Sequence, residues 1–288
     1  MGYGLVARFW PAAQPHARAS VLIAHGMGEH SGRYQPLAQA LNKAGYHVLA
    51  PDLRGHGRSR PEYCEPGDMG YDGWQRSLLD LQFLQKWLAR THARPVILIG
   101  HSMGAMLAQQ YLGYFGYTLA ACLLSGSTGA LPTVTTVGGE LLASLDSQRL
   151  GPHSPSPILR DHLFSANNKR FQNLQDEPDQ QGFNWLSRDT EHVAAYVADP
   201  LCGAVLCSRS LADMFSGLRR SSRASHIACI PKGLPVRFIS GADDPVHNNG
   251  HGIRRLVRRY EKAQLNVSSK LYPGGRHELF NETNRGQV

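Results

Sequence analysis

The pentapeptide GHSMG at residues 100–104 is the stretch that decides the fold. An apolar run typical of a buried strand precedes it at 96–99, and a stretch with helical character follows it at 105–114. A Gly-x-Ser-x-Gly between a strand and a helix predicts a nucleophile elbow, in which two glycines leave room for a strained turn that lifts the serine hydroxyl above the sheet. A Gly/Ser-rich loop without chemistry is the alternative interpretation.

Apolar runs and helical patterns alternate on both sides of this pentapeptide. Toward the N-terminus, strands are predicted at 20–24 and 46–50 and helices at 34–44 and 72–89. Toward the C-terminus, a fully buried strand is predicted at 119–125. This alternation predicts an α/β fold, a mostly parallel doubly wound sheet with its functional site at the carboxyl ends of the strands.

Two glycine-rich loops follow the first two predicted strands. Residues 25–28, HGMG, can aim backbone amides at a ligand oxygen because glycines carry no side chain, which predicts an oxyanion hole. A tight turn without chemistry is the alternative. Residues 52–59, DLRGHGRS, have no following helix with Lys-Ser/Thr, so we expect a structural loop next to the site and no phosphate cradle.

Residues 126–232 break the alternation, since they are rich in Pro, Ser and Asn and show no clear parallel strand. Helices are predicted at 139–150, at 204–218, and from the N-cap Asp189 to residue 198. About a hundred residues is too long for an ordinary loop, so we expect a helical lid inserted over the strand ends. The predicted organisation is a first core part at 1–127, a lid at 128–232 and a second core part at 233–288.

The apolar residues of this insertion are candidates to line a substrate pocket. The alternative is that they form a small core of the insertion itself. They are Leu141, Leu142, Leu145, Phe164, Phe183, Trp185, Met214 and Phe215.

The sheet resumes with strands predicted at 235–240 and 266–272. Asp243 and Asp244 follow the first of them, at the strand end where an acid that orients a histidine belongs, and His277 follows the second. Serine, acid and histidine occur in the chain order of α/β-hydrolases. Asp244 and His277 are 33 residues apart, about one βαβ unit, so both can lie at neighbouring strand tips.

The 288 residues include 42% hydrophobic and 18% charged ones, which indicates a folded protein. The net charge of +8 is scattered along the chain without an aromatic-basic repeat, so we expect no nucleic-acid partner. A predicted helix at 253–263 carries four arginines, which we interpret as a solvated face, with membrane contact as the alternative. No leader and no membrane span is recognisable, so a cytoplasmic location is expected, with peripheral membrane association through the lid as an added possibility.

Five cysteines, an odd number at irregular spacings, form no CxxC pair and lie near no His cluster at zinc spacing. We expect reduced, buried thiols, no metal and no cofactor. The five are Cys64, Cys122, Cys202, Cys207 and Cys229.

Five ordered motifs give the chain a resemblance to the monoacylglycerol lipase and lysophospholipase branch of the α/β-hydrolases. These motifs are HGMGEHSGRY at 25–34, DLRGHGRS at 52–59, GHSMG at 100–104, GADDPV at 241–246 and RHELFNE at 276–282. Two stretches of the insertion, FNWLSRD at 183–189 and YVADPLCG at 196–203, resemble bacterial lysophospholipase-like members. The resemblance covers nearly the whole chain.

The resemblance implies Ser102 as nucleophile, Asp244 as acid, His277 as base and the Met27 and Met103 amides as oxyanion hole, with Asp243 as the competing acid. Gly100 and Gly104 are the elbow glycines. It further implies a serine esterase that cleaves a single-chain lipid ester, foremost monoacylglycerol, through an acyl-enzyme on Ser102. Lysophospholipase is the alternative within this branch. Proline-type peptidase, haloperoxidase and a catalytically inactive binding module are the other classes that share the fold.

Similar chains continue beyond the stretch at 281–285 into another amphipathic helix, whereas this sequence ends at Val288. If the chain is complete, we expect one sheet face to be less covered, with an effect on stability more than on chemistry.

Overall fold

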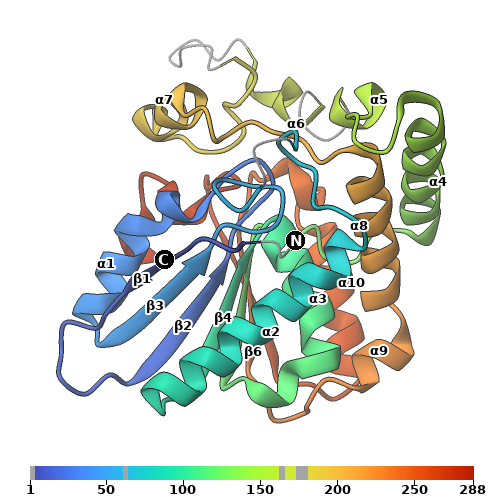
Figure 1. Ribbon diagram of the computed structural model, residues 1–288. Helices are drawn as coiled ribbons and strands as arrows, with labels where there is room; N and C mark the ends of the chain where they lie inside the picture. The colour runs from blue at the N-terminus through green and yellow to red at the C-terminus, as the bar shows by residue number, and fades with distance from the viewer. Residues whose placement is uncertain (1–3, 61–63, 162–165, 173–180) are drawn as a thin grey trace.

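Seven strands form one mixed sheet in the computed structural model, which describes residues 4–60, 64–161, 166–172 and 181–288 (Figure 1). The strand order is β1-β3-β2-β4-β5-β6-β7, and every neighbouring pair is parallel except β1 and β3. This confirms the mostly parallel sheet that the alternating pattern predicts, and it is the sheet of the α/β-hydrolase fold that the ordered motifs imply. The strands are β1 Ala7–Trp10, β2 Ala19–Ala24, β3 Tyr46–Pro51, β4 Val96–His101, β5 Ala121–Ser125, β6 Val236–Gly241 and β7 Val267–Tyr272.

The first strand, β1, is the one that the sequence analysis did not predict. It pairs antiparallel with β3, with Ala7 opposite Pro51 and Trp10 opposite Val48. Three of its four residues are exposed, so it carries neither the apolar run nor the strict alternation that marks the six parallel strands. An edge strand of this kind is held by its backbone pairing more than by burial of its side chains.

Helices cover both faces of the sheet. Leu22 and Leu98 belong to a large core that they share with α2, α3, α8 and α10. The neighbouring strand residues Val21 and Ile99 point to the other face, where they pack with α1 in a smaller cluster. The helices that flank the sheet are α1 Gln35–Lys43, α2 Gly73–His92, α3 Met103–Phe115 and α10 His251–Lys262.

The segment between β5 and β6 contributes further helices, and in Figure 1 α6 and α7 lie above the carboxyl ends of the strands, with α5 beside α4. These helices are α4 Thr133–Leu150, α5 Pro157–Arg160, α6 Ala166–Asn168, α7 Thr190–Ala198, α8 Ser208–Ser221 and α9 Ala224–Ala228. The Asp189 carboxylate accepts a hydrogen bond from the His192 amide, so the predicted N-cap is confirmed.

Helix α8 packs directly on the core. A Cβ on Gly217 would lie 2.1 Å from Trp74 Nε1, and Met214 and Leu218 belong to the large core. Part of the insertion therefore shares the main core. The boundaries at 128 and 232 and the separate lid remain a prediction.

Two predicted helix starts in this segment are wrong. Helix α4 begins six residues before 139, at Thr133. The predicted helix at 204–218 begins only at Ser208, because the preceding backbone runs against the loop at Gly67. The Cys207 amide donates to the Gly67 carbonyl oxygen at 3.1 Å, which a helical start at 204 would prevent.

Within the described residues, no helix combines the length and the apolar character that crossing a bilayer requires.

Candidate active site

The elbow places Ser102 between β4 and α3 in a strained conformation. Its φ is +51° and its ψ is −116°, a region that residues with side chains rarely adopt. A Cβ on Gly100 would lie 2.5 Å from the Gly104 carbonyl oxygen, and a Cβ on Gly104 would lie 2.0 Å from the Ala24 oxygen. Both glycines are therefore required by close backbone approach, as the pentapeptide predicts.

Asp244 is the acid that contacts the histidine. Its Oδ2 lies 3.0 Å from His277 Nδ1 and also accepts the Ser240 hydroxyl at 2.8 Å, and its Oδ1 accepts the Val246 amide at 2.9 Å. Asp243 instead forms a half-exposed ion pair with Arg170 at 2.7 Å. The geometry thus separates two neighbouring aspartates that the sequence leaves in competition.

The Asp244–His277 pair is buried, and each partner shifts the pKa of the other. Burial would raise the pKa of the Asp244 carboxyl, but the adjacent His277 lowers this pKa to about 2. Burial would lower the pKa of His277, but the Asp244 charge and hydrogen bond outweigh it, so the pKa of this imidazole lies above its usual value. Because Nδ1 is held by Asp244, Nε2 is the ring nitrogen available for proton transfer.

Ser102 and His277 line one pocket of about 90 Å³. The segment between β5 and β6 supplies the apolar walls Trp185, Leu186 and Met214. No Lys or Arg lies among the described lining residues of this pocket. These residues are Gly26, Met27, Glu29, His101, Ser102, Met103, Met106, Thr128, Asn167, Trp185, Leu186, Tyr196, Met214, Val246, His277 and Glu278.

Of the predicted apolar pocket residues, Trp185 and Met214 line the Ser102 pocket. The others do not. Leu141 and Leu145 are 60% and 55% exposed on α4, because the opposite side of that helix packs on α8. Leu142 and Phe215 pack in the large core, Phe183 packs on Tyr196, and Phe164 lies outside the described residues.

The two amides predicted as an oxyanion hole belong to residues that line this pocket, Met27 and Met103. The loop of Met27 lies against the elbow, since a Cβ on Gly26 would be 3.2 Å from Ser102 Cβ. Met103 is the first residue of α3, so its amide has no acceptor within the helix. Among the described residues, the Met27 amide also has no hydrogen-bond acceptor. Both N–H groups are thus free to bind an oxygen of a substrate.

A buried ion network behind the histidine was not assigned by the sequence analysis, although its residues lie in the quoted motifs. Arg33 donates to both Glu278 oxygens at 2.6 and 2.7 Å and to Glu29 Oε2 at 2.8 Å. Glu29 Oε1 in turn accepts the Gly26 amide at 2.6 Å and the Tyr34 hydroxyl at 2.8 Å. The network therefore joins the loop of Met27 to the loop of His277.

The carboxylates of this network are held ionised. Burial would raise the pKa of Glu278, but Arg33 lowers this pKa to about 2, and Arg33 likewise holds the pKa of Glu29 below its usual value. His101 packs against His277, with ring centroids 4.9 Å apart, and burial lowers the pKa of His101 to about 4. His101 is therefore neutral at pH 7 and adds no positive charge beside His277.

One group in the described part of the chain has the composition of a metal site, namely His30, Asp199 and Cys202. His30 Nδ1 accepts the Gly32 amide at 3.1 Å, so the proton of the neutral ring is on Nε2, which donates to Asp199 Oδ2 at 2.8 Å. A metal on Nε2 would leave neither ring nitrogen protonated, whereas a histidine ligand normally donates its other N–H. Burial also raises the pKa of the Cys202 thiol. These residues therefore do not fit a metal.

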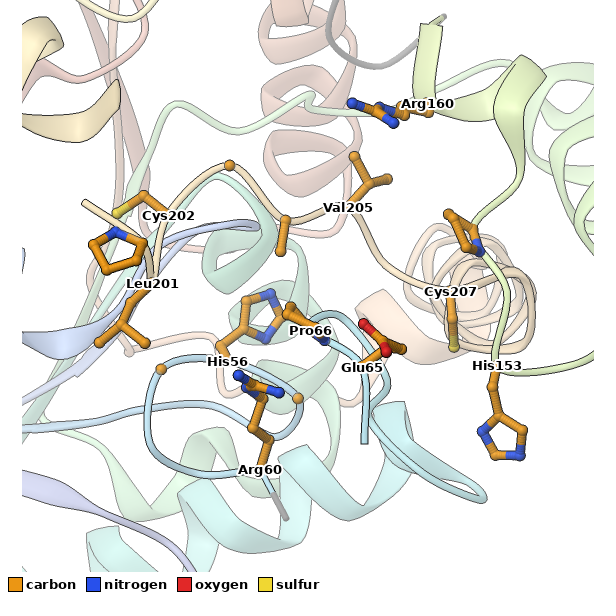
Figure 2. Close-up of a pocket in the computed structure, with 16 residues that line it drawn as sticks. His56, Arg60, Glu65, Pro66, His153, Arg160, Leu201, Cys202, Val205 and Cys207 are labelled. Atoms are coloured by element: carbon orange, nitrogen blue, oxygen red, sulfur yellow. The ribbon is translucent and has the colours of Figure 1, made fainter. Parts of the chain in front are cut away.

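A larger cavity of about 440 Å³ lies beside the loop of His56 and is shown in Figure 2. Arg60 and Val205 lie on its walls, whereas neither Ser102 nor His277 lines it. Gly203 lines this larger cavity, and the Gly203 amide donates to the Gly28 carbonyl oxygen at 2.9 Å. This larger cavity is thus distinct from the one that Ser102 and His277 line.

Comparisons with known proteins agree with this geometry. The family model described as serine aminopeptidase S33 matches residues 15–284. The monoacylglycerol lipase of Mycolicibacterium smegmatis is 31% identical, over 98% of this chain and 88% of the relative, and human monoglyceride lipase is 27% identical, over 98% and 82%. A thermostable carboxyl esterase from Bacillus coagulans, solved in complex with glycerol, superposes with a TM-score of 0.88 at 26% identity, over 99% of this chain and 90% of the other.

Proposed function

The chain belongs to the serine aminopeptidase S33 family of α/β-hydrolases, a serine hydrolase family, and on that premise we propose that it hydrolyses single-chain acyl esters, foremost monoacylglycerols. The observation that carries the proposal is the buried Asp244–His277 pair on the pocket that also contains Ser102. In this proposal Ser102 supplies the hydroxyl, His277 is the base, and Asp244 is the acid that orients the base.

The proposed reaction has two half-reactions. Ser102 Oγ attacks the ester carbonyl carbon while His277 Nε2 takes its proton, and the Met27 and Met103 amides stabilise the negative oxygen that develops. The carbon–oxygen bond to the alcohol then breaks, and His277 returns the proton to the departing oxygen. Water next attacks the acyl carbon and gives a proton to His277, which passes it to Ser102 Oγ as the acid leaves.

The residues that line the pocket favour a substrate with a neutral headgroup over one with an anionic headgroup. Apolar side chains such as Trp185 and Met214 suit an acyl chain, and the charged groups on the described lining are the carboxylates Glu29 and Glu278. With no Lys or Arg on that lining, a phosphate would be placed near negative charge without a cation to pair with it. This favours monoacylglycerol over lysophospholipid, and it agrees with the relatives that are named monoacylglycerol lipases.

The peptidase alternative has less support from the same residues. An aminopeptidase needs a carboxylate for the free α-amino group of its substrate. Both oxygens of Glu29 and of Glu278 already accept hydrogen bonds within the protein, Arg33 being a donor to each carboxylate, so neither carboxylate is open to an amino group of a substrate.

Peripheral contact with a lipid surface is part of the proposal. Val134, Leu141 and Leu145 recur at helical spacing on α4 and are 78%, 60% and 55% exposed. Such a stripe of exposed apolar side chains suits insertion into an interface from which a single-chain ester would be taken.

Labelling with a fluorophosphonate tests the enzyme class. We expect stoichiometric labelling of the wild type and none of Ser102→Ala, with the fold of the variant checked by circular dichroism. A binding module would not be labelled.

A rate comparison of monoacylglycerol, lysophosphatidylcholine, triacylglycerol and an aminoacyl anilide tests the substrate. A preference for the anilide or the triacylglycerol would contradict the single-chain ester proposal.

A further inference from the structure

A groove separate from the Ser102 pocket lies between the N-terminal half of α4, the C-terminal ends of α8 and α10, and α9. Its volume of about 780 Å³ exceeds that of the Ser102 pocket and falls in the usual range of ligand sites, roughly 300–1,000 Å³. None of its lining residues lines the Ser102 pocket. In Figure 1, α4, α8 and α9 lie together at the side of the molecule opposite β1.

The floor of this groove is apolar. Ile227 is 3% exposed and belongs to the large core, and Leu131 and Ala263 are partly buried against the same core. Val137 of α4 forms one wall and is 38% exposed. An alkyl chain that covers these side chains would remove apolar surface from water, which is favourable in proportion to the area covered.

The rim of the groove is cationic. Arg219, Arg223, Arg259 and Lys262 line it, and the described lining contains no Asp or Glu. Arg219 pairs with Glu140 at 2.9 Å. Within the described part of the chain, the other three have no carboxylate partner, and Arg259 donates to the Ser222 carbonyl oxygen at 3.2 Å. Three uncompensated cations around one concavity repel one another, and a bound anion would relieve that repulsion.

We propose that this groove binds a single-chain amphiphile with an anionic head, namely a fatty-acid carboxylate. The alkyl chain covers the floor at Ile227, and the carboxylate lies among the rim cations. The site is concave and bounded by four helices, so it suits one molecule better than the flat surface of a bilayer. This proposal does not depend on the chemistry at Ser102, because it concerns a different cavity.

Photo-crosslinking with a diazirine-bearing dodecanoic acid tests the site on the full chain. We expect cross-links in peptides that contain residues 131–137 and 223–228. The charge-reversal pair Arg223→Glu and Lys262→Glu should lower this labelling about tenfold. The matched control, Arg254→Glu with Arg255→Glu, changes the net charge equally on the exposed face of α10 and should leave the labelling unchanged.

The milder pair Arg223→Gln and Lys262→Gln should give an intermediate loss, and it replaces the reversal pair if melting temperatures show that the latter is misfolded. A probe with an alcohol in place of the carboxylate should label weakly. Four outcomes would overturn the proposal: cross-links confined to the Ser102 pocket, equal labelling by the alcohol probe, labelling retained in both rim variants, or binding to anionic vesicles without binding of the monomeric acid.

Discussion

Arg33 and Glu278 are 245 residues apart in the chain and form a two-point ion pair, at 2.6 and 2.7 Å, next to the histidine of the site. The same guanidinium binds Glu29, which holds the Gly26 amide at the proposed oxyanion loop. Because both carboxylates are buried, this pair fixes the relative positions of two loops that the chemistry needs. We therefore expect it to act as a positioning device in addition to its effect on stability.

Replacing Arg33 by Gln leaves Glu29 and Glu278 buried without a cation. Breaking a buried pair of this kind costs about 3–5 kcal/mol in the free energy of unfolding, measurable by urea denaturation. The two uncompensated carboxylates also raise the pKa of His277 further, so the acid limb of activity should move to higher pH. Adding Glu278→Gln should reverse part of both effects. If the pH profile stays unchanged while stability falls, the network has a structural role alone.

Asp244→Asn and Asp243→Asn separate the two neighbouring aspartates. Asparagine at 244 can no longer stabilise the charged form of His277, and the analogous loss in a serine–histidine–aspartate triad lowers kcat about 10⁴-fold. Asparagine at 243 breaks a half-exposed pair with Arg170, whose contribution is at most about 1 kcal/mol, so activity should be retained. Steady-state rates of the two variants on a soluble ester distinguish the two aspartates. Loss of activity in Asp243→Asn with activity retained in Asp244→Asn would show that the acid is Asp243.

The acid limb of the pH profile follows from His277. As general base, this histidine must be neutral, and Asp244 keeps its pKa above the 6.5 that is usual for a histidine. The rate of fluorophosphonate labelling should therefore reach half of its maximum above pH 6.5 and fall tenfold per unit at lower pH. In Asp244→Asn the raising charge is gone while burial remains, so the slow residual labelling should persist to a lower pH. A wild-type midpoint well below 6.5 would contradict the proposed role of His277.

The six parallel strands and the elbow could be predicted because their signals are local. Apolar runs mark buried strands, and Gly100 and Gly104 mark a turn in which backbones nearly touch. Strand β1 could not be predicted in this way, since most of its residues are exposed and the pairing with β3 defines it. The late start of α8 has a similar cause, because the hydrogen bond from the Cys207 amide to the Gly67 carbonyl oxygen joins segments that are distant in the chain.

The same difference between local signals and long-range contacts decides which parts of the site could be predicted. The order of serine, acid and histidine is visible in sequence, but the choice of Asp244 over Asp243 depends on which carboxylate reaches His277, and only three-dimensional contacts decide that. The Arg33–Glu278 pair has no local signal at all. The pocket volume is equally inaccessible to sequence, because it depends on how Met214 and Trp185 from the insertion pack over Ser102.

That volume leads to a prediction about acyl chain length. The pocket of about 90 Å³ is well below the roughly 300 Å³ at which ligand sites begin, so a long acyl chain must displace side chains to enter it. Met214 is 2% exposed and lines the pocket. Met214→Ala should therefore raise kcat/KM for dodecanoyl relative to butanoyl esters by about tenfold, the scale on which a hydrophobic pocket discriminates chain length.

The same change should lower the free energy of unfolding by about 2–5 kcal/mol, because it also leaves a cavity in the core shared with α2 and α3. Met214→Leu nearly conserves volume and serves as the control, with a small change in stability and the wild-type chain-length profile. If the alanine variant loses stability while its chain-length profile matches that of the leucine variant, then Met214 packs the core without limiting the acyl site, and the chain enters past another wall.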